Sequence, residues 1–400
     1  MIDRRRLVLG CGASLLFGRA TFGGSETAAL PSGDAPADDL IALPGKKPLI
    51  KRTSRPPNFE TPLADLRSPY TANDAFFVRY HLANIPEVDP VAWRLRVDGA
   101  SAGRKLDLSL DDLRRRFEQV SVVAINQCSG NRRGLFMPRA AGVQWGYGAM
   151  GNATWTGVRL RDVLNRAGVR GDALEVVFDG ADSAVLPGTP DFVKSLPVDK
   201  ALHEDTLIAF EMNGQPLPHW HGAPARLVVP GWTATYWMKH LVEIRVEPAR
   251  FDGFWMKTGY RVPTGKFPGA SFRSQETAET TPITEILVNS LLTSHENGTR
   301  IPLAKATNIM GWAWDGGSGI DLVEISADDG RSWQRASLGS DLGRYAWRQF
   351  SWKLQPSAAG VLRVAVRARS RGGAVQPVAL TPNPAGYHHN VIQTLQLEVA

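Results

Sequence analysis

Short apolar runs, separated by turns, dominate this chain, and their character changes near residue 270. Before that point, helical spacing predicts a helix over Leu110–Phe117, capped by Ser109, and a second helix from Leu160 to Ala167, ended by Gly168. β-Branched and apolar runs predict strands over Arg94–Val97, Val120–Ile125, Leu174–Phe178, Ala225–Val229 and Leu241–Val246. Strands mixed with helices, without a regular βαβ repeat, predict an α+β domain, which we place over 46–270.

Beyond Gly269 the helical signals fade and short strands follow one another. The hairpin signal Asp328-Asp329-Gly330 separates two of them. The predicted strands are Thr284–Leu291, Asn308–Trp314, Leu322–Ala327 and Val361–Arg369. This pattern predicts an immunoglobulin-like β-sandwich over 271–400.

The N-terminus predicts export. Arg4, Arg5 and Arg6 precede an apolar run, Leu7–Phe17, that is too short to span a bilayer, which needs about 20 apolar residues. This arrangement is typical of a twin-arginine signal, here over 1–28, followed by a linker over 29–45. We therefore expect a periplasmic protein without an integral membrane segment in the mature chain.

Composition and charge argue against some classes of function. With 43% hydrophobic and 21% charged residues, the 400-residue chain is typical of a globular protein. The net charge of +7 is scattered, and no Lys/Arg run longer than three residues follows the N-terminus, so nucleic-acid binding is not indicated. A mild positive bias favours an anionic substrate or an acidic partner.

The strand over Val120–Ile125 ends in the stretch with most chemical potential. It runs into Asn126 and Gln127, and then into Cys128, Ser129, Gly130, Asn131, Arg132 and Arg133. Positive charge favours the thiolate, the form of cysteine that binds metals. A buried structural cysteine is the alternative, but the polar, glycine-rich surroundings argue against it. If the signal is removed, Cys128 is the only thiol left.

Other stretches carry weaker signals. A short strand over residues 76–81 would place Arg79 and His81 on one face. His219 and His221 form an H-x-H pair, which is weak evidence for zinc without a third ligand. Tyr260 is flanked by cations, which predicts a lowered pKa and a hydrogen bond to an anion, with simple packing as an equal alternative.

Several of these motifs, taken together and in order, resemble the sulfite oxidase family of molybdenum enzymes. They are Phe77-Val78-Arg79-Tyr80-His81, Gln127 to Arg133, Met212-Asn213-Gly214-Gln215-Pro216-Leu217-Pro218, Arg226 to Gly231, and Lys239. The resemblance implies that Cys128 binds molybdenum and that Arg79, Tyr260 and Arg133 face the substrate. It implies that the molybdopterin cofactor is held by Phe77, Val78, Arg79, His81, Cys128, Asp182, His221, Arg226, Trp237, Met238 and Lys239.

The activity implied by this resemblance is oxidation of sulfite to sulfate, with the sandwich domain forming a homodimer. The chain has no Cys-x-x-Cys-His sequence and no flavin or dinucleotide fingerprint, so we expect neither haem nor flavin, and a separate c-type cytochrome as electron acceptor. One departure lies in the tail, where some family members have a substrate-binding arginine and this chain has His388 and His389.

Three alternatives remain. Nitrate reductases of the eukaryotic type share the resemblance, but they carry haem and flavin domains. A reductase acting on sulfoxides or another oxyanion uses a related core, typically without the sandwich. An exported binding protein without enzymatic activity would leave the Cys128 motif unexplained.

Overall fold

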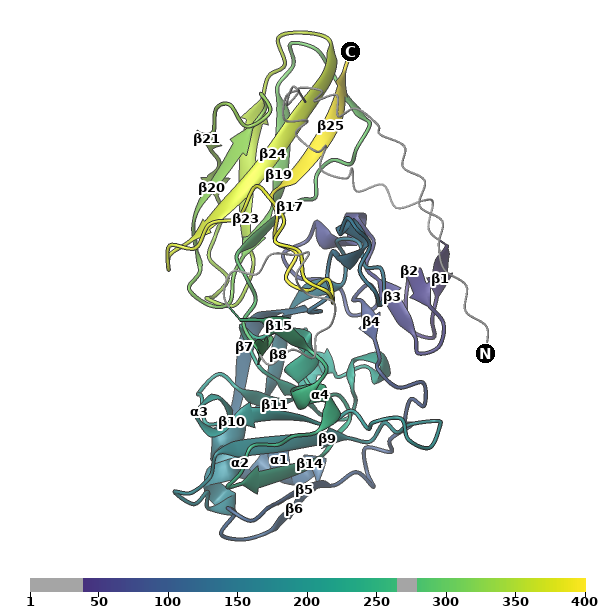
Figure 1. Ribbon diagram of the computed structural model, residues 1–400, viewed down its shortest axis with the longest axis vertical. Helices are drawn as coiled ribbons and strands as arrows, with labels where there is room; N and C mark the ends of the chain where they lie inside the picture. Colours follow the sequence, from purple (N-terminus) through teal and green to yellow (C-terminus); the bar gives the residue numbers. More distant parts are fainter. Residues whose placement is uncertain (1–38, 265–278) are drawn as a thin grey trace, which may run out of the picture. The chain divides into compact units, whose positions relative to one another are not determined.

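The computed structural model describes residues 39–264 and 279–400 (Figure 1). The predicted export signal and most of the predicted linker lie outside these residues. No helix in the described ranges has the length and hydrophobicity needed to cross a membrane. Strands predominate, with a few short helices before residue 264 and a two-sheet β-region at the C-terminal end, which confirms the predicted fold class.

The first sheet supplies one wall of the functional site. Its strands run in the order β1-β2-β3-β4, and β1 begins inside the segment predicted as linker. Their bounds are β1 Leu40–Ala42, β2 Pro48–Thr53, β3 Asn58–Glu60 and β4 Val78–Arg79. The strand expected over residues 76–81 is shorter because Phe76 and Phe77 are both buried, which breaks the alternation of a strand.

Two five-stranded sheets form the main part of the first region. One has the order β10-β9-β14-β5-β6, and only its β14–β5 pair is parallel. Its strands are β5 Leu95–Asp98, β6 Leu106–Leu108, β9 Glu175–Gly180, β10 Lys194–Pro197 and β14 Leu241–Glu247. The other sheet has the order β12-β11-β8-β7, with β13 paired to β11; its strands are β7 Gln119–Gln127, β8 Met150–Arg159, β11 Leu207–Met212, β12 Gln215–Pro216 and β13 Arg226–Val228.

Sequence patterns do not predict β8, although it pairs with both β7 and β11. Gly151 and Gly157 interrupt its apolar positions, because the neighbouring elements leave no room for a side chain. A Cβ atom at Gly157 would lie 2.0 Å from the Ile208 carbonyl oxygen, and one at Gly151 would lie 2.5 Å from the Phe76 ring. Close packing between central strands therefore hides the period-2 signal.

The helices follow their local signals. In α1, Leu110–Arg116, the Ser109 hydroxyl accepts from the Asp112 amide at 3.0 Å and the Asp112 carboxylate accepts from the Ser109 amide at 3.0 Å, which is a capping box. α2, Leu160–Ala167, ends at Gly168 with φ of 74°. The remaining helical elements are η1 Leu63–Leu66, η2 Arg133–Leu135, α3 Val198–Ala201, η3 His219–His221, η4 Ala234–Tyr236 and α4 Phe254–Lys257.

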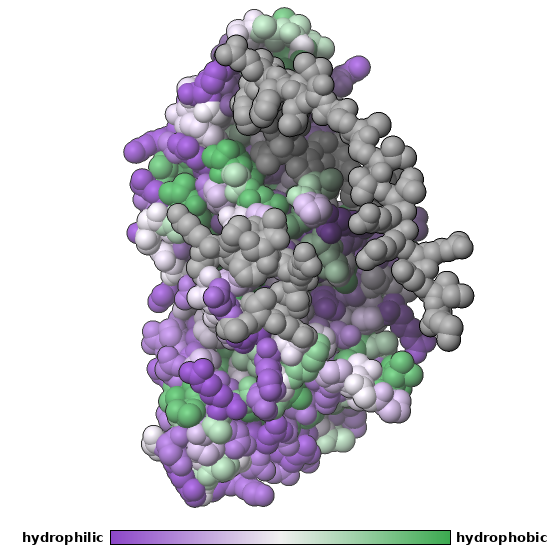
Figure 2. Space-filling model, viewed as in Figure 1, coloured by the Kyte–Doolittle hydropathy of each residue, from purple (hydrophilic) through white to green (hydrophobic). Residues whose placement is uncertain are grey.

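After the hairpin of β15 (Arg261–Pro263) and β16 (Thr280–Pro282), two sheets form the predicted sandwich. One has the order β17-β19-β23-β22, and the other has the order β18-β25-β24-β20-β21. Their strands are β17 Asn289–Leu292, β18 Thr299–Ile301, β19 Thr307–Trp314, β20 Ile320–Ser326, β21 Gln334–Arg335, β22 Ser337–Leu338, β23 Arg348–Leu354, β24 Gly360–Ser370 and β25 Gln393–Val399. Figure 2 shows mainly polar side chains on the visible face, with hydrophobic ones in small groups.

Contacts from the sandwich region fix the end of β7. The Trp314 indole donates to Gln127 Oε1 at 2.7 Å, and the Arg132 guanidinium donates to the Ser290 carbonyl at 2.7 Å. Farther along the chain, the His388 amide donates to the Ser129 carbonyl at 3.4 Å. The loop that carries Cys128 is thus held by residues more than 150 positions away in the sequence.

Candidate active site

Cys128 lies just beyond the buried end of β7. Its amide donates to the Ala149 carbonyl at 2.9 Å, and its carbonyl accepts from the Asn131 amide at 3.0 Å. Gly130 allows this tight turn to pack, because a Cβ atom there would lie 2.6 Å from the Arg133 guanidinium. The thiol is unpaired and only 6% exposed, and it faces a cavity. The local geometry therefore presents one thiol to an enclosed space.

The cavity brings together most of the predicted site residues. Those that line it are Phe77, Arg79, His81, Cys128, Asp182, His221, Arg226, Trp237, Met238, Lys239 and Tyr260. They come from three sheets and the loops between them, so the site is assembled from segments spread over 180 positions of the chain. Two predicted residues, Val78 and Arg133, do not line it.

Val78 and Arg133 support the site from outside. Val78 is buried against Leu49 and Phe59. Arg133 donates to the Ala385 carbonyl at 2.8 Å, and its guanidinium lies 5.0 Å from the centre of the Tyr387 ring. Because Tyr387 stacks on Tyr260 at 5.5 Å, Arg133 contacts the wall behind the cavity and not the cavity itself.

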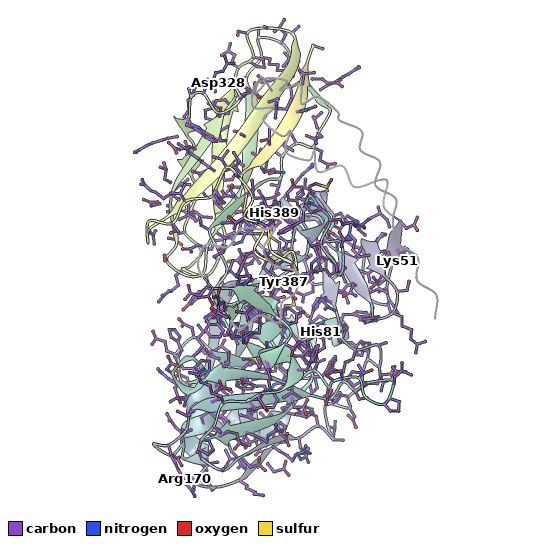
Figure 3. All side chains as sticks on the ribbon, viewed as in Figure 1. Lys51, His81, Arg170, Asp328, Tyr387 and His389 are labelled. Atoms are coloured by element: carbon purple, nitrogen blue, oxygen red, sulfur yellow. The ribbon has the colours of Figure 1, made fainter. Side chains whose placement is uncertain are left out.

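Arg79, His81 and Tyr260 form a hydrogen-bonded cluster inside the cavity. Arg79 Nη2 lies 3.4 Å from the Tyr260 hydroxyl, which is also hydrogen-bonded to His81 Nε2. Arg79 Nη1 donates to Asn58 Oδ1 at 3.2 Å and to the Tyr80 carbonyl, and these bonds fix the guanidinium. Figure 3 labels His81 and Tyr387, and the rings of both contact that of Tyr260.

Burial decides which of these groups is charged. Although burial opposes the charge of Arg79, the nearby Tyr260 and Cys128 raise its pKa, so it is a cation. Burial, followed by repulsion from Arg79, holds the pKa of His81 well below its usual value, so the imidazole is neutral. The predicted lowering of the Tyr260 pKa is wrong: burial raises it and outweighs Arg79 and Arg133. Tyr260 is thus a neutral hydroxyl that can donate.

A second group of side chains forms a buried cationic cluster, defined as Lys46, Arg226 and Lys239. Lys46 Nζ lies 2.5 Å from His221 Nε2, and Arg226 donates to the His221 carbonyl at 3.1 Å. Lys239 Nζ donates to the carbonyls of Arg79 and Trp220, both at 2.9 Å. None of these cations forms an ion pair within the described ranges. Backbone carbonyls hold them in place without neutralising them.

This cluster is electrostatically unfavourable as it stands. Burial, opposed by Asp74, lowers the pKa of Lys46 to about 7, and burial lowers that of Arg226 to about 9. Burial and then repulsion from Arg226 bring the pKa of Lys239 well below its usual value. Uncompensated buried charge is expensive, and a bound anion would reverse these shifts.

These observations test whether the residues fit a molybdopterin cofactor. The cluster can neutralise a phosphate, and the buried Arg226 Nε and Thr235 Oγ1 have no hydrogen-bond partner. Cys128 offers a soft sulfur ligand of the kind that binds metals tightly. In the described ranges no three His, Cys, Asp or Glu side chains form a metal-ligand group, so the protein offers one thiolate rather than a complete coordination set. The residues present fit the cofactor.

Other lining residues were not found from the sequence. They include Tyr80, Asn126, Ser129, Phe192 and Thr235. Lys46 was also not predicted, because it lies beside Lys47 in a short segment between Gly45 and Pro48, 175 positions from the His221 that it contacts. Phe192 stacks on His81 with centroids 3.6 Å apart. An isolated cation or aromatic residue in an irregular segment carries no local signal of such a contact.

His388 and His389 are neutral. Burial lowers the pKa of His388 to about 4 and that of His389 to about 3, so neither replaces the positive charge of the arginine that some family members have there. His219 does not line the cavity, unlike His221. Asp182 does, and burial raises its pKa to about 6 despite its own backbone amide and Lys239.

Comparisons with known proteins identify the class that this fold and site define. The oxidoreductase molybdopterin-binding domain matches residues 81–255, and the Mo-co oxidoreductase dimerisation domain matches residues 280–399. The sulfite oxidase of Gallus gallus is 35% identical over 367 residues, which cover 88% of this chain and 78% of that protein. The chain belongs to the sulfite oxidase family of molybdopterin enzymes.

Further comparisons show how much of each similar protein this chain covers. The mitochondrial sulfite oxidase of Homo sapiens is 35% identical over 364 residues, 88% of this chain and 65% of that protein. The chain thus spans about two thirds of the length of its mammalian relatives. A nitrate reductase [NADH] of Hordeum vulgare is 31% identical over 377 residues, 40% of its length. The crystal structure of the sulfane dehydrogenase SoxCD from Paracoccus pantotrophus has the same fold, with a TM-score of 0.75 at 24% identity over 94% of this chain and 93% of that chain.

Proposed function

We propose that this chain is a molybdopterin-dependent enzyme that oxidises sulfite to sulfate and passes the electrons to a separate c-type cytochrome. One observation carries the proposal: the cavity places the free thiol of Cys128 beside a fixed cation, Arg79, and a neutral donor, Tyr260. The similarity to sulfite oxidases over 88% of the chain supports sulfite as the substrate.

The cofactor would be held by residues with separate tasks. Cys128 would bind the metal, while Lys46, Arg226 and Lys239 would neutralise the phosphate of the pterin. When bound, the molybdenum centre would supply the two-electron oxidation that converts sulfite and water to sulfate and two protons. The hydrogen bonds of the buried cationic cluster to backbone carbonyls keep the three cations oriented before the cofactor arrives.

The substrate residues would act as preorganised donors. Arg79 is fixed by its bonds to Asn58 and Tyr80, so its charge can bind an oxyanion without reorganising. Tyr260, being neutral, can donate a hydrogen bond from its hydroxyl group to a sulfite oxygen. The neutral imidazole of His81 would donate from Nε2 to that same hydroxyl oxygen and hold its orientation, which leaves the hydroxyl proton free to face sulfite. Phe192 and Trp255, packed on His81, exclude water from this side.

The location and assembly are part of the proposal. The consecutive arginines at positions 4–6 and the following apolar run support export to the periplasm by the twin-arginine route. The match to a dimerisation domain over residues 280–399 supports a homodimer. Electrons would leave one at a time, since the acceptor proposed is a cytochrome.

Nitrate is the second candidate substrate, favoured by the similarity to the Hordeum vulgare nitrate reductase. The test measures metal content by mass spectrometry and compares three activities on the full-length protein: sulfite-dependent ferricyanide reduction, and viologen-dependent reduction of nitrate and of methionine sulfoxide. Bound molybdenum with sulfite turnover alone is the expected result. Molybdenum with turnover of nitrate or sulfoxide and none of sulfite would overturn the proposal.

A further inference from the structure

Contacting aromatic side chains lead from the catalytic cavity to the protein surface. Phe192 stacks on His81, and Trp255 follows with its ring centre 5.4 Å from that of Phe192. Phe254 lies 4.9 Å beyond Trp255 and is 43% exposed. The ring contacts are therefore continuous between the residues that line the cavity and solvent.

A loop of unusual composition lies beside this aromatic path. Residues 181–193 join β9 to β10; within this connection Asp182 and Phe192, which flank the loop of residues 183–191, both line the cavity. The Trp255 indole donates to the Pro190 carbonyl at 3.4 Å, which ties the loop to α4. The loop exposes 53% of Val185 and 68% of Leu186. We define Val185, Leu186 and Phe254 as the apolar rim.

The apolar rim packs into no hydrophobic core within the described ranges. Large hydrophobic residues gathered on a surface mark sites of interaction with other molecules more often than scattered single ones do. None of the three residues belongs to a buried core cluster of the described ranges. Their position at the outer end of the aromatic path connects them to the catalytic cavity, so their exposure calls for a partner of the enzyme.

The charges next to the apolar rim indicate the sign of that partner. Asp191 is exposed at the end of the loop and forms no ion pair within the described ranges. Asp179 contributes little charge, because burial raises its pKa to about 7. The cations Lys257 and Arg245 are each close to a carboxylate, at 4.0 Å from Asp252 and in contact with Glu243 respectively. The unpaired charge beside the loop is thus negative, although the chain as a whole carries +7.

We propose that the apolar rim is the docking surface for the electron acceptor, a basic haem protein of the cytochrome c class. The inference rests on the proposed function, in which electrons pass to a separate cytochrome. A haem edge that lies in an apolar patch surrounded by lysines would contact Leu186 and Phe254, and its lysines would face Asp191. A rim of three residues suits the small, weak interface of an electron-transfer encounter. Carboxylates would speed association by steering.

The experiment follows sulfite oxidation by the full chain with two acceptors in parallel: a basic mitochondrial-type cytochrome c, and ferricyanide, which needs no docking surface. Leu186→Lys should raise the KM for cytochrome c about tenfold, since it places a cation in the apolar contact. Ferricyanide turnover should remain within about twofold of the wild type. Val361→Lys is the matched control, because Val361 is equally exposed, at 68%, on β24 of the sandwich.

A second variant tests the electrostatic part. Asp191→Asn should lower kcat/KM for cytochrome c at low salt and flatten its decrease with ionic strength, again without an effect on ferricyanide turnover. An unchanged KM for cytochrome c in Leu186→Lys, with ferricyanide turnover intact, would overturn the docking surface alone. If the wild type showed no sulfite-dependent ferricyanide reduction, that result would instead contradict the proposed function.

Discussion

Ionisable side chains are shifted toward their neutral forms in the catalytic cavity and toward their charged forms on the β-sandwich. In the cavity, burial lowers the pKa of Lys46 to about 7 and raises that of Asp182 to about 6, so both groups are displaced toward neutrality. On the sandwich, hydrogen bonds from Arg369 lower the pKa of Asp321, and those from Ser332 lower the pKa of Asp328 to about 2. There the charged forms are favoured.

The difference separates residues that serve function from residues that serve folding. A buried cation without a counter-ion costs free energy in the empty protein and gains it only when an anion binds. An exposed ion pair contributes little but costs nothing either. The buried cations of the cavity therefore reduce the stability of the empty protein and increase its affinity for an anion. The exposed ion pairs of the sandwich do neither.

The largest effect should come from the thiol. Cys128→Ser should abolish sulfite turnover, because a hydroxyl is a poor substitute for a thiolate ligand of a soft metal. Pterin should remain bound, since the buried cationic cluster does not include the thiol. Turnover is measured with ferricyanide, and pterin by fluorescence after release. Near-normal sulfite oxidation by this variant would remove Cys128 from its role as metal ligand.

Arg79→Gln should have the next largest effect. The loss of one or two charge-assisted hydrogen bonds, each worth about 1.5–3 kcal/mol, should lower kcat/KM for sulfite and raise KM. Arg300→Gln is the control, because Arg300 is exposed and pairs with Glu398 on the sandwich. If the two variants had equal kcat/KM values, Arg79 would not contact the substrate.

Acid should destabilise the region of the cavity before it affects the carboxylates of the sandwich. Burial lowers the pKa of His240 to about 3, against about 6.5 in the unfolded chain. The unfolded state binds the proton first, so this contribution to stability is complete above about pH 6.5 and is lost as pH falls toward 3, by up to about 1.4 kcal/mol per pH unit. The stabilisation from Asp328, whose pKa falls from 3.8 to about 2 on folding, is lost only as pH falls through 3.8 toward 2.

Urea unfolding at pH 7, 6 and 5 measures this dependence. His240→Gln should reduce the slope of the unfolding free energy with pH by about one proton, while it can still donate to the Ala223 carbonyl in place of Nδ1. A slope equal to that of the wild type would show that His240 is not buried in its neutral form.

The smallest effect is expected on the sandwich. Arg369→Ala removes two hydrogen bonds to Asp321, of 3.2 and 2.8 Å, between side chains that are 44% and 35% exposed. Exposed pairs are worth about 0.2–1 kcal/mol, so the unfolding free energy at pH 7 should fall by no more than that. A loss above about 2 kcal/mol would contradict the contrast between the two regions.

The sequence predicted the elements whose signals are local. The cap at Ser109 and the end of α2 at Gly168 both occur where expected. β8 was not predicted because its glycines are required by close packing against residues distant in the chain. Within the site, the motif residues were found, but Lys46 and Phe192 were not, since their contacts depend on tertiary packing alone.

The direction of the Tyr260 pKa shift could not be predicted from the sequence either. Cations near Tyr260 in the sequence suggested a lowered pKa, but its burial against Tyr387 and His81 outweighs them. Tyr387 lies 127 positions away, and only the path of the tail back to the Cys128 loop brings it there. Desolvation is a property of the assembled fold, so charge spacing alone cannot predict it.

The central claim is that the cavity binds molybdopterin and uses it to oxidise sulfite. The most direct measurement combines molybdenum bound per chain with sulfate formed per ferricyanide reduced, on anaerobic protein supplied with sulfite. The account predicts about one molybdenum per chain and one sulfate for each pair of ferricyanide ions reduced. Sulfate formation by protein that contains no molybdenum, or a molybdenum-loaded protein that forms no sulfate, would contradict it.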